Sequence, residues 1–198
     1  MDISARERKR QIRLETGKRI ALLDEGYTRE ADRQILSLVQ SLPDYKRARN
    51  IFCFVGSGRE INTSPFLQQA LEDGKVVAVP LCVGKRQMEP RIINALSDLK
   101  EGYFGILEPG EESALLPPQE IDLAVIPCMT CSYEGVRLGF GGGYYDTFFQ
   151  AYPRIKSVMI CRDRLVREDI PREEHDIVFE RLITEKGIFK KEMPVVES

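Results

Sequence analysis

Residues 50–81 read NIFCFVGSGREINTSPFLQQALEDGKVVAVPL, and the order of elements in this stretch decides the fold. The stretch begins and ends with mainly apolar runs of strand length, NIFCFV at 50–55 and KVVAVPL at 75–81. A strand that is buried on both faces of a sheet is apolar along nearly its whole length. Between the two runs, a loop leads into a helical segment with Pro65 near its start and Gly74 after its end. The order strand, loop, helix, strand predicts a βαβ unit and therefore a parallel sheet.

The flanking segments continue this alternation. Strands are expected at residues 87–93, 122–127, 155–161 and, as the last strand, 178–184. Helices are expected at 4–23 with Ser4 as cap, at 28–42 with Thr28 as cap, and at about 143–152. Residues 108–119, EPGEESALLPPQ, are expected to form a surface loop because they are rich in Pro, Gly and acid. A chain of 198 residues with this pattern is most simply one α/β domain over residues 1–198.

Charge and hydropathy exclude several classes of protein. The chain has 29 Lys and Arg against 31 Asp and Glu, so its net charge of −2 gives no overall attraction for nucleic acid or anionic membranes. The N-terminal segment lacks the apolar centre of a secretory leader, and apolar stretches such as 76–83 are too short to span a bilayer. We therefore expect a cytoplasmic, monomeric protein whose partners are small molecules, with no nucleic acid and no membrane.

Cysteines raise the question of metal binding. Five are present, which suits a reducing compartment, and Cys128 and Cys131 form a C-x-x-C pair after an expected strand. A structural zinc site needs four ligands, but the chain has no second C-x-x-C pair and its only histidine is distant in sequence. A redox pair is a further alternative. We favour small buried cysteines at the end of a strand.

The segment Arg137–Asp146, RLGFGGGYYD, is the strongest candidate for a ligand site. It contains four glycines, and a backbone without Cβ atoms can approach a ligand closely and direct several N–H groups at one anion. The segment matches neither the Walker loop nor the dinucleotide-binding pattern. Arginine at its start suits phosphate, and aspartate at its end suits magnesium beside phosphate. The segment and the loop at 56–60 both follow strands, and ligands of parallel sheets bind beyond the carboxyl ends of strands.

Other candidate residues each have a structural alternative. Lys9 and Arg13 are four residues apart and share one face of the expected first helix, where they could clamp a polyphosphate or form a solvated basic face. Glu60 could be a ligand or a solvated loop residue. Tyr144 and Tyr145 could flank a flat ring, although aromatic residues at a helix start more often belong to the core. The acidic turn at 173–176, which includes His175 and Asp176, could be plain surface.

Taken together and in order, these motifs resemble the 5-formyltetrahydrofolate cyclo-ligase family, also known as methenyltetrahydrofolate synthetases. The motifs are KRQIR near the start, EINT after the first strand, VPL after the second, then EPG, GVRLGFGGGYYD and EHD. The resemblance covers nearly the whole chain, from Lys9 to about Gly187. The glycine and tyrosine segment is highly specific, and the order of the weaker motifs argues against coincidence.

The resemblance implies a three-layer α/β/α sandwich around a mainly parallel, Rossmann-like sheet. It also implies an enzyme that uses ATP and Mg²⁺ to convert 5-formyltetrahydrofolate into 5,10-methenyltetrahydrofolate, with release of ADP and phosphate. Phosphorylation of the formyl oxygen would create a leaving group, and a neighbouring folate nitrogen could then attack the formyl carbon. The main tasks of such an enzyme are positioning and charge neutralisation.

The family pattern further implies roles for individual residues. Lys9 and Arg13 would bind the ATP phosphates, and Glu60 would accept hydrogen bonds from the polar edge of the pterin. Asp146 would hold magnesium, with Asp176 as a weaker second candidate. The pattern also implies Arg137 and Tyr145 as catalytic residues, and Tyr144 and Tyr145 as contacts of the folate. The residues implied around ATP are Arg137, Gly139, Phe140, Gly141, Gly142, Gly143, Tyr144 and Tyr145.

Some positions depart from the family pattern. The departures are Asn62 where aspartate is common, Thr147 where arginine is frequent, Ser132 and Tyr133 in place of a phenylalanine-aspartate form, and Phe140 where tyrosine is frequent. The changes at Asn62 and Thr147 keep a non-catalytic folate- or nucleotide-binding homologue open as an alternative. A sugar-phosphate isomerase-like or transferase-like enzyme on a similar sheet is a further alternative, because fold does not fix function. The set Lys9, Arg13, Glu60, Arg137 and Asp146 favours the cyclo-ligase, because an isomerase has no use for an ATP clamp.

Overall fold

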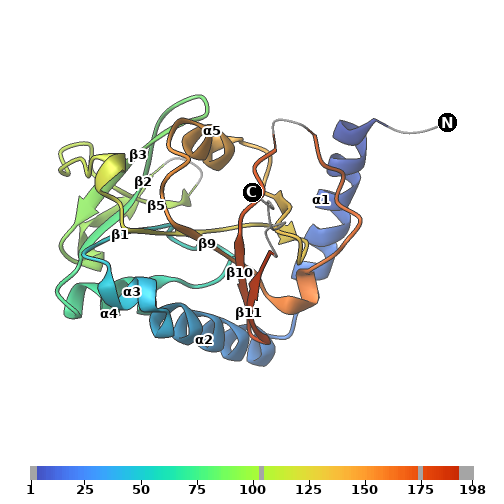
Figure 1. Cartoon of the computed structure of the whole chain (residues 1–198), viewed down its shortest axis with the longest axis horizontal. Helices are drawn as coiled ribbons and strands as arrows, with labels where there is room; N and C mark the ends of the chain where they lie inside the picture. The colour runs from blue at the N-terminus through green and yellow to red at the C-terminus, as the bar shows by residue number, and fades with distance from the viewer. Residues whose placement is uncertain (1–3, 103–104, 174–175, 192–198) are drawn as a thin grey trace, which may run out of the picture.

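The computed structural model describes residues 4–102, 105–173 and 176–191, and its centre is a seven-stranded sheet (Figure 1). The strands lie in the order β11-β10-β9-β6-β1-β2-β3. Their bounds are Asn50–Cys53 (β1), Val76–Gly84 (β2), Gln87–Ile93 (β3), Leu123–Ile126 (β6), Ser157–Ile160 (β9), Arg181–Thr184 (β10) and Gly187–Lys190 (β11). The five central strands pair in parallel, while β3 and β11 pair antiparallel at the two edges. The predicted βαβ unit and mainly parallel sheet are confirmed.

Helices cover both faces of the sheet and complete three layers. On one face lie α2 (Glu25–Ser41), α3 (Pro43–Arg47) and α4 (Ser64–Glu72); α5 (Tyr144–Ala151) covers the other. Side chains alternate along each strand, so Ile51 and Cys53 join the core under α2 to α4, while Phe52 packs against Phe148 of α5. The expected α/β/α sandwich is confirmed.

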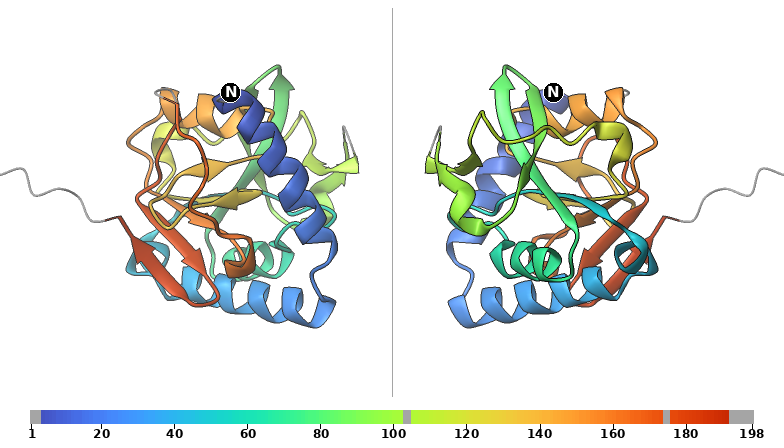
Figure 2. Two further views of the ribbon diagram at one scale, coloured as in Figure 1. Left: turned by 90° about the vertical axis from the view of Figure 1, so that its right-hand side faces the viewer. Right: turned by 90° about the vertical axis from the view of Figure 1, so that its left-hand side faces the viewer.

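The first helix, α1 (Ala5–Ala21), lies beside the carboxyl ends of the central strands (Figures 1 and 2). Ser4 caps it as predicted, since the Ser4 hydroxyl accepts a hydrogen bond from the Glu7 N–H at 3.2 Å. Ile12 on its inner side packs with Leu138 and Ile170. The helix therefore faces the edge of the sheet at which ligands of parallel sheets bind.

Two helix and strand boundaries were predicted wrongly. The second helix begins at Glu25, because Asp24 caps it by accepting a hydrogen bond from the Tyr27 N–H at 3.0 Å, so Thr28 lies inside the helix. Residues 178–184 do not form one continuous last strand. Val178 makes an isolated bridge to Val136, β10 begins only at Arg181, and β11 follows it in a hairpin.

The smaller elements lie around this frame. Within the expected loop at 108–119, residues 108–109 belong to β5 (Leu107–Pro109), which pairs with β4 (Leu99–Glu101), so that part of the prediction was wrong. The other short elements are β7 (Thr130–Cys131), β8 (Arg137–Leu138) and the 3-10 turns η1 (Leu96–Asp98), η3 (Pro118–Glu120) and η4 (Asp163–Leu165). Across the part of the chain that the structure describes, we find no helix with the length and apolar character that crossing a membrane requires.

Candidate active site at the carboxyl ends of the strands

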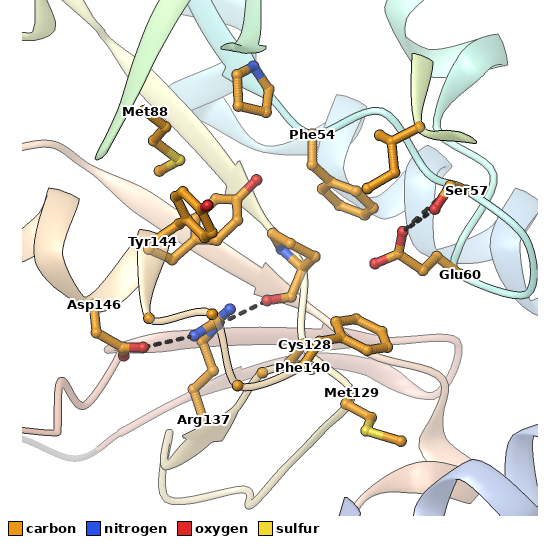
Figure 3. A pocket seen from close by; sticks show the side chains of 18 of the residues that line it. Phe54, Ser57, Glu60, Met88, Cys128, Met129, Arg137, Phe140, Tyr144 and Asp146 are labelled. Atoms are coloured by element: carbon orange, nitrogen blue, oxygen red, sulfur yellow. Dashed lines mark hydrogen bonds and ion pairs between the residues drawn. The ribbon is translucent and has the colours of Figure 1, made fainter. Parts of the chain in front are cut away.

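A cleft of about 1590 Å³ opens where β1, β6 and β9 end (Figure 3). Its walls come from α1, the loop after β1, the β2–β3 hairpin, and the glycine-rich segment before α5. Pockets for one small ligand commonly measure roughly 300–1,000 Å³. The cleft is therefore large enough for two substrates side by side.

The glycine-rich segment forms one wall of the cleft. Gly141 and Gly143 have φ values of 103° and 73°, in the left-handed region that favours glycine. Gly143 is also the residue before α5, so the positive end of that helix faces the cleft. A Cβ atom on Gly139 would lie 2.6 Å from Nη2 of Arg137. The absence of a side chain at Gly139 lets Arg137 approach the backbone, and a glycine-rich turn before a helix suits an anion.

Arg137 is held in one position beneath this segment. Its Nε donates to the carbonyl oxygen of Pro127 at 2.8 Å, and its Nη1 lies 3.3 Å from Oδ2 of Asp146. The guanidinium group also lies 5.1 Å from the centre of the Tyr145 ring. Only 6% of the Arg137 side chain is exposed. Its charge is thus fixed at the floor of the cleft.

Arg13 of α1 reaches the same segment from the opposite side. Its Nε donates to the carbonyl oxygen of Gly139 at 2.8 Å, and its Cζ lies 3.7 Å from where a Cβ of Gly141 would be. Burial and the nearby charge of Arg137 lower the pKa of Arg13. Two guanidinium groups that repel each other beside a glycine-rich turn are relieved by an anion between them.

Lys9 lies one turn earlier on α1 and is already paired. Its Nζ lies 2.6 Å from carboxylate oxygens of both Glu173 and Asp176. Burial opposes the charge on Lys9, but the hydrogen bonds to Asp176 and Glu173 outweigh it and raise the pKa of Lys9. Lys9 lines the cleft and is 8% exposed, so it does not belong to a solvated basic face.

The two metal candidates differ in availability. Asp176 accepts hydrogen bonds from Lys9 and from the Glu173 N–H, the latter at 2.7 Å. Among the residues that the structure describes, Asp146 has only the longer contact with Arg137, and 32% of its side chain is exposed in the cleft. His175, which belongs to the same motif as Asp176, lies outside the described residues.

Glu60 lies across the cleft from the glycine-rich segment (Figure 3). One of its carboxylate oxygens accepts hydrogen bonds from the Ser57 N–H at 3.0 Å and from the Ser57 hydroxyl at 3.1 Å. Burial raises the pKa of Glu60, although these two hydrogen bonds oppose the shift. A half-buried carboxylate of this kind is a strong acceptor for the N–H groups of a flat polar ligand.

Aromatic residues separate the two ends of the cleft. Tyr144 and Tyr145 are both half-buried and pack against the core under α5. Burial raises the pKa of Tyr145, so its hydroxyl stays protonated and can donate a hydrogen bond but cannot act as a general base. Phe140 is 57% exposed and lines the cleft, where it offers a flat apolar surface.

Sequence reasoning missed two arginines that line this cleft, Arg86 and Arg162. Arg86, in the β2–β3 turn, lines the cleft, and its Nε would lie 3.2 Å from a Cβ on Gly143. Arg162, two residues after β9, forms a buried ion pair with Asp32 of α2 at 2.7 Å. Arg162 also donates to the backbone oxygens of Arg59 and Glu60, at 2.8 and 2.9 Å. The position of Arg162 just beyond an expected strand could have identified it as a site residue from the sequence, whereas its ion pair with Asp32 could not have been predicted.

Asn62, one of the departures from the family pattern, makes a contact that supports the local structure. The Asn62 side chain accepts a hydrogen bond from the Ser64 N–H at 3.2 Å at the start of α4, and Asn62 does not line the cleft. This contact between a side chain and the backbone two residues on is an Asx turn, which asparagine and aspartate both form. Thr147, in contrast, lines the cleft beside Asp146.

Comparison with known proteins gives a consistent result. The sequence profile of the 5-formyltetrahydrofolate cyclo-ligase family matches residues 5–185. A probable 5-formyltetrahydrofolate cyclo-ligase of Schizosaccharomyces pombe is 26% identical over 92% of this chain and 98% of its own length. The mitochondrial 5-formyltetrahydrofolate cyclo-ligase of Arabidopsis thaliana is 28% identical over 92% of this chain and 76% of its own. The solved structure of Aquifex aeolicus 5,10-methenyltetrahydrofolate synthetase is similar with a TM-score of 0.81 and 28% identity, covering 96% of both chains.

Proposed function

Because the chain belongs to the 5-formyltetrahydrofolate cyclo-ligase family, we propose that it converts 5-formyltetrahydrofolate and ATP into 5,10-methenyltetrahydrofolate, ADP and phosphate. One observation carries the proposal. A single cleft has two converging arginines on a glycine-rich segment at one end and the half-buried Glu60 at the other. These ends suit a polyphosphate and a pterin, respectively.

The arginine end is the proposed ATP site. Arg13 and Arg137 would bind the phosphates together with the backbone N–H groups of residues 139–143. Lys9 would join them once phosphate oxygens replace Glu173 and Asp176 as its partners. The depressed pKa of Arg13 supports this assignment, since burial and then the nearby charge of Arg137 lower it, and a bound anion would relieve both effects.

The proposed folate site lies between Glu60 and the tyrosines. Glu60 would accept hydrogen bonds from the ring N–H and amino group of the pterin, while Tyr144, Tyr145 and Phe140 would contact its flat faces. The hydrogen bonds from Ser57 to one carboxylate oxygen keep the Glu60 side chain in a fixed orientation before substrate binds. Such pre-organisation lowers the entropy lost on binding.

The residues fit a magnesium ion bound with the nucleotide. Asp146 offers carboxylate oxygen, the ligand that this hard cation prefers, next to the proposed phosphate site. When bound, magnesium would neutralise charge on the phosphate oxygens. Asp176 is a weaker candidate because it must first release Lys9.

The proposed chemistry has two steps. The formyl oxygen attacks the γ-phosphorus of ATP, the bond to the bridging oxygen breaks and ADP leaves. The neighbouring folate nitrogen then attacks the formyl carbon and loses its proton, and the C–O bond breaks to release phosphate. Arg13 and Arg137 would stabilise the charge on the transferred group, and the protonated Tyr145 hydroxyl would donate a hydrogen bond to it.

The direct test is a mixture of the purified protein with 5-formyltetrahydrofolate, ATP and magnesium, followed through the absorbance of the methenyl product. We expect product formation that needs all three additions. A protein that binds folate and ATP by calorimetry but yields no product would instead support the non-catalytic homologue.

The role of Asp146 has its own test. Asp146→Ala should raise the magnesium concentration needed for half-maximal activity by at least about tenfold. Loss of a residue that only supports a metal ligand already lowers metal affinity by about this factor. Glu72→Ala, on the exposed side of α4 and away from the cleft, is the matched control and should behave as wild type. An unchanged magnesium dependence in folded Asp146→Ala would remove Asp146 from the metal site.

A further inference from the structure

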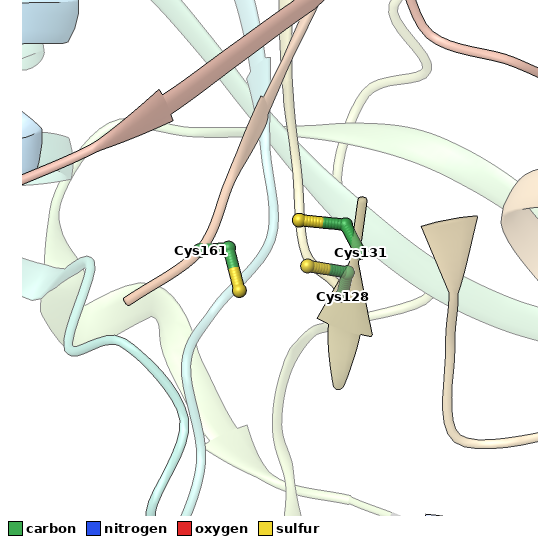
Figure 4. Close-up of side chains that lie close together, drawn as sticks. All are labelled: Cys128, Cys131 and Cys161. Atoms are coloured by element: carbon green, nitrogen blue, oxygen red, sulfur yellow. The ribbon is translucent and has the colours of Figure 1, made fainter. Parts of the chain in front are cut away.

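Three cysteine side chains meet at the floor of the cleft (Figure 4). The sulfur atoms of Cys128, Cys131 and Cys161 all lie within 4.8 Å of one another. The expectation of separate small buried cysteines at a strand end is therefore incomplete, because Cys161 joins the C-x-x-C pair from another strand. In the figure, the sulfur atoms of Cys128 and Cys131 point toward Cys161.

The register of the sheet brings these residues together. Ile126 of β6 pairs with Met159 of β9 in parallel, and Cys128 and Cys161 are each two residues further along. Their side chains thus leave neighbouring strands at the same edge and on the same face. Cys131 returns to this point on β7, which is anchored to β8 by pairing with Arg137.

The geometry and surroundings suit a cation. Thiolate-to-zinc bonds of about 2.3 Å place three sulfur atoms roughly 4 Å apart in a trigonal set, which is within the observed spacing. Cys131 and Cys161 are buried, while Cys128 is half-exposed and lines the cleft, which leaves one side of the cluster open to a further ligand.

From this geometry we propose that Cys128, Cys131 and Cys161 form a binding site for a thiophilic d¹⁰ metal ion, of the class Zn²⁺, Cd²⁺ and Cu⁺. Three sulfur ligands select soft ions, whereas magnesium requires oxygen. Binding releases the thiol protons to solvent, and the fourth position of a tetrahedral ion would be taken by water from the cleft. The site is chemically separate from the oxygen ligands of Asp146.

The test is a Cd²⁺ titration of the reduced protein, followed through the ultraviolet charge-transfer absorbance of thiolate–cadmium bonds. We expect one ion per chain, with the signal unchanged in excess magnesium. Cys128→Ser should weaken Cd²⁺ binding by at least about tenfold. Loss of a residue that only supports a metal ligand already lowers metal affinity by about tenfold or more, and loss of a ligand itself should cost at least as much. Cys82→Ser is the matched control, because Cys82 is exposed and does not belong to the cluster, and it should bind Cd²⁺ as wild type does.

A second measurement avoids substitution in the core. In the Cys82→Ser protein, only Cys128 among the remaining cysteines is accessible to a thiol reagent such as a dithiobis-nitrobenzoate. One equivalent of Cd²⁺ should block this reaction in the folded chain. The proposal would be overturned by wild-type affinity in Cys128→Ser, by displacement of Cd²⁺ with magnesium, or by continued reaction of Cys128 when Cd²⁺ is present.

Discussion

The carboxyl group of Glu60 connects ligand binding to stability. Burial raises the pKa of Glu60 above the ordinary value of 4.5, which means that the fold disfavours the ionised form. The resulting stabilisation is fully present below the pKa of the unfolded chain and is lost as the pH rises through the raised pKa of the folded state. At neutral pH the ionised Glu60 side chain therefore lowers the free energy of unfolding, a cost that its proposed role in binding the pterin would explain.

Glu60→Gln should consequently separate the two effects. The amide can still accept the hydrogen bonds of Ser57, so we expect a higher Tm than wild type at pH 7 to 8, with the difference vanishing below about pH 4, where the wild-type side chain is neutral. Loss of a charged acceptor is worth about 1.5–3 kcal/mol. The KM for folate should thus rise roughly 10- to 150-fold, while the KM for ATP stays near its wild-type value.

Glu72→Gln, a change on an exposed helix face, provides the comparison for both measurements. Equal increases in KM for folate and ATP would contradict the assignment of Glu60 to the pterin. A Tm below that of wild type at neutral pH would contradict the argument from its buried charge.

At the scale of elements, the loop after β1 owes its shape to a contact with α2. Asp32 forms a bidentate pair with Arg162, and Arg162 in turn holds the backbone oxygens of Arg59 and Glu60. Asp32 also accepts a hydrogen bond from the Asn62 N–H at 2.9 Å. The exposed fractions of the Arg162 and Asp32 side chains are only 4% and 11%, so removal of either partner leaves a buried charge.

Asp32→Ala should therefore destabilise the protein by about 3–5 kcal/mol in urea unfolding. Where the variant is still folded, we expect weaker folate binding and nearly unchanged ATP binding, since only the Glu60 side of the cleft depends on the pair. Arg33→Ala removes an exposed ion pair on the same helix and should leave the unfolding midpoint unchanged. Loss of ATP and folate binding in equal measure would argue against this positioning role.

The turn before α5 permits a matched comparison of glycines. Gly143 has φ 73° in the cleft, and Gly74 has φ 72° after α4, where a Cβ atom would meet nothing within 4 Å. Each substitution by alanine should cost about 1–2 kcal/mol of stability, because both force a left-handed backbone on a residue with a Cβ atom. Only Gly143→Ala should also raise the KM for ATP, since its Cβ would crowd Arg86 and the phosphate path. Unaltered ATP kinetics in Gly143→Ala would separate this turn from the nucleotide site.

The elements that could be predicted from the sequence are those whose signal is local. The fully apolar runs of β1, β2 and β6 and the glycine-rich segment carry their own signature, so the parallel sheet and one wall of the cleft were expected. β11 was missed because Gly187–Lys190 is only partly buried and mixes charged with apolar residues. Cys161 and the pair of Asp32 with Arg162 join residues distant in sequence, and such contacts depend on strand register and helix packing.

For the whole molecule, α1 is held by fewer buried apolar side chains than α2, and this difference predicts which helix nucleotide binding should stabilise more. α2 buries Ile35, Leu36 and Val39 in the main core, whereas the buried residues of α1 are Lys9, Ile12 and Thr16. The buried hydroxyl of Thr16 has no hydrogen-bond partner among the described residues, which further weakens the attachment of α1. Elements with few buried apolar contacts open at lower free energy than core elements do.

Hydrogen exchange should reveal this difference. Without ligand, we expect the amides of α1 to exchange faster than those of α2, because α1 can leave the sheet edge without disrupting the main core. With ATP and magnesium at about 100 times the Kd, binding through Lys9 and Arg13 should slow exchange in α1 by up to about 100-fold, since ligand stabilises the bound state by RT ln(1 + [L]/Kd). α2 does not line the cleft and serves as the internal reference. If saturating ATP leaves the exchange of α1 unchanged relative to α2, the nucleotide is not held by this helix, and the assignment of Lys9 and Arg13 to the phosphates is wrong.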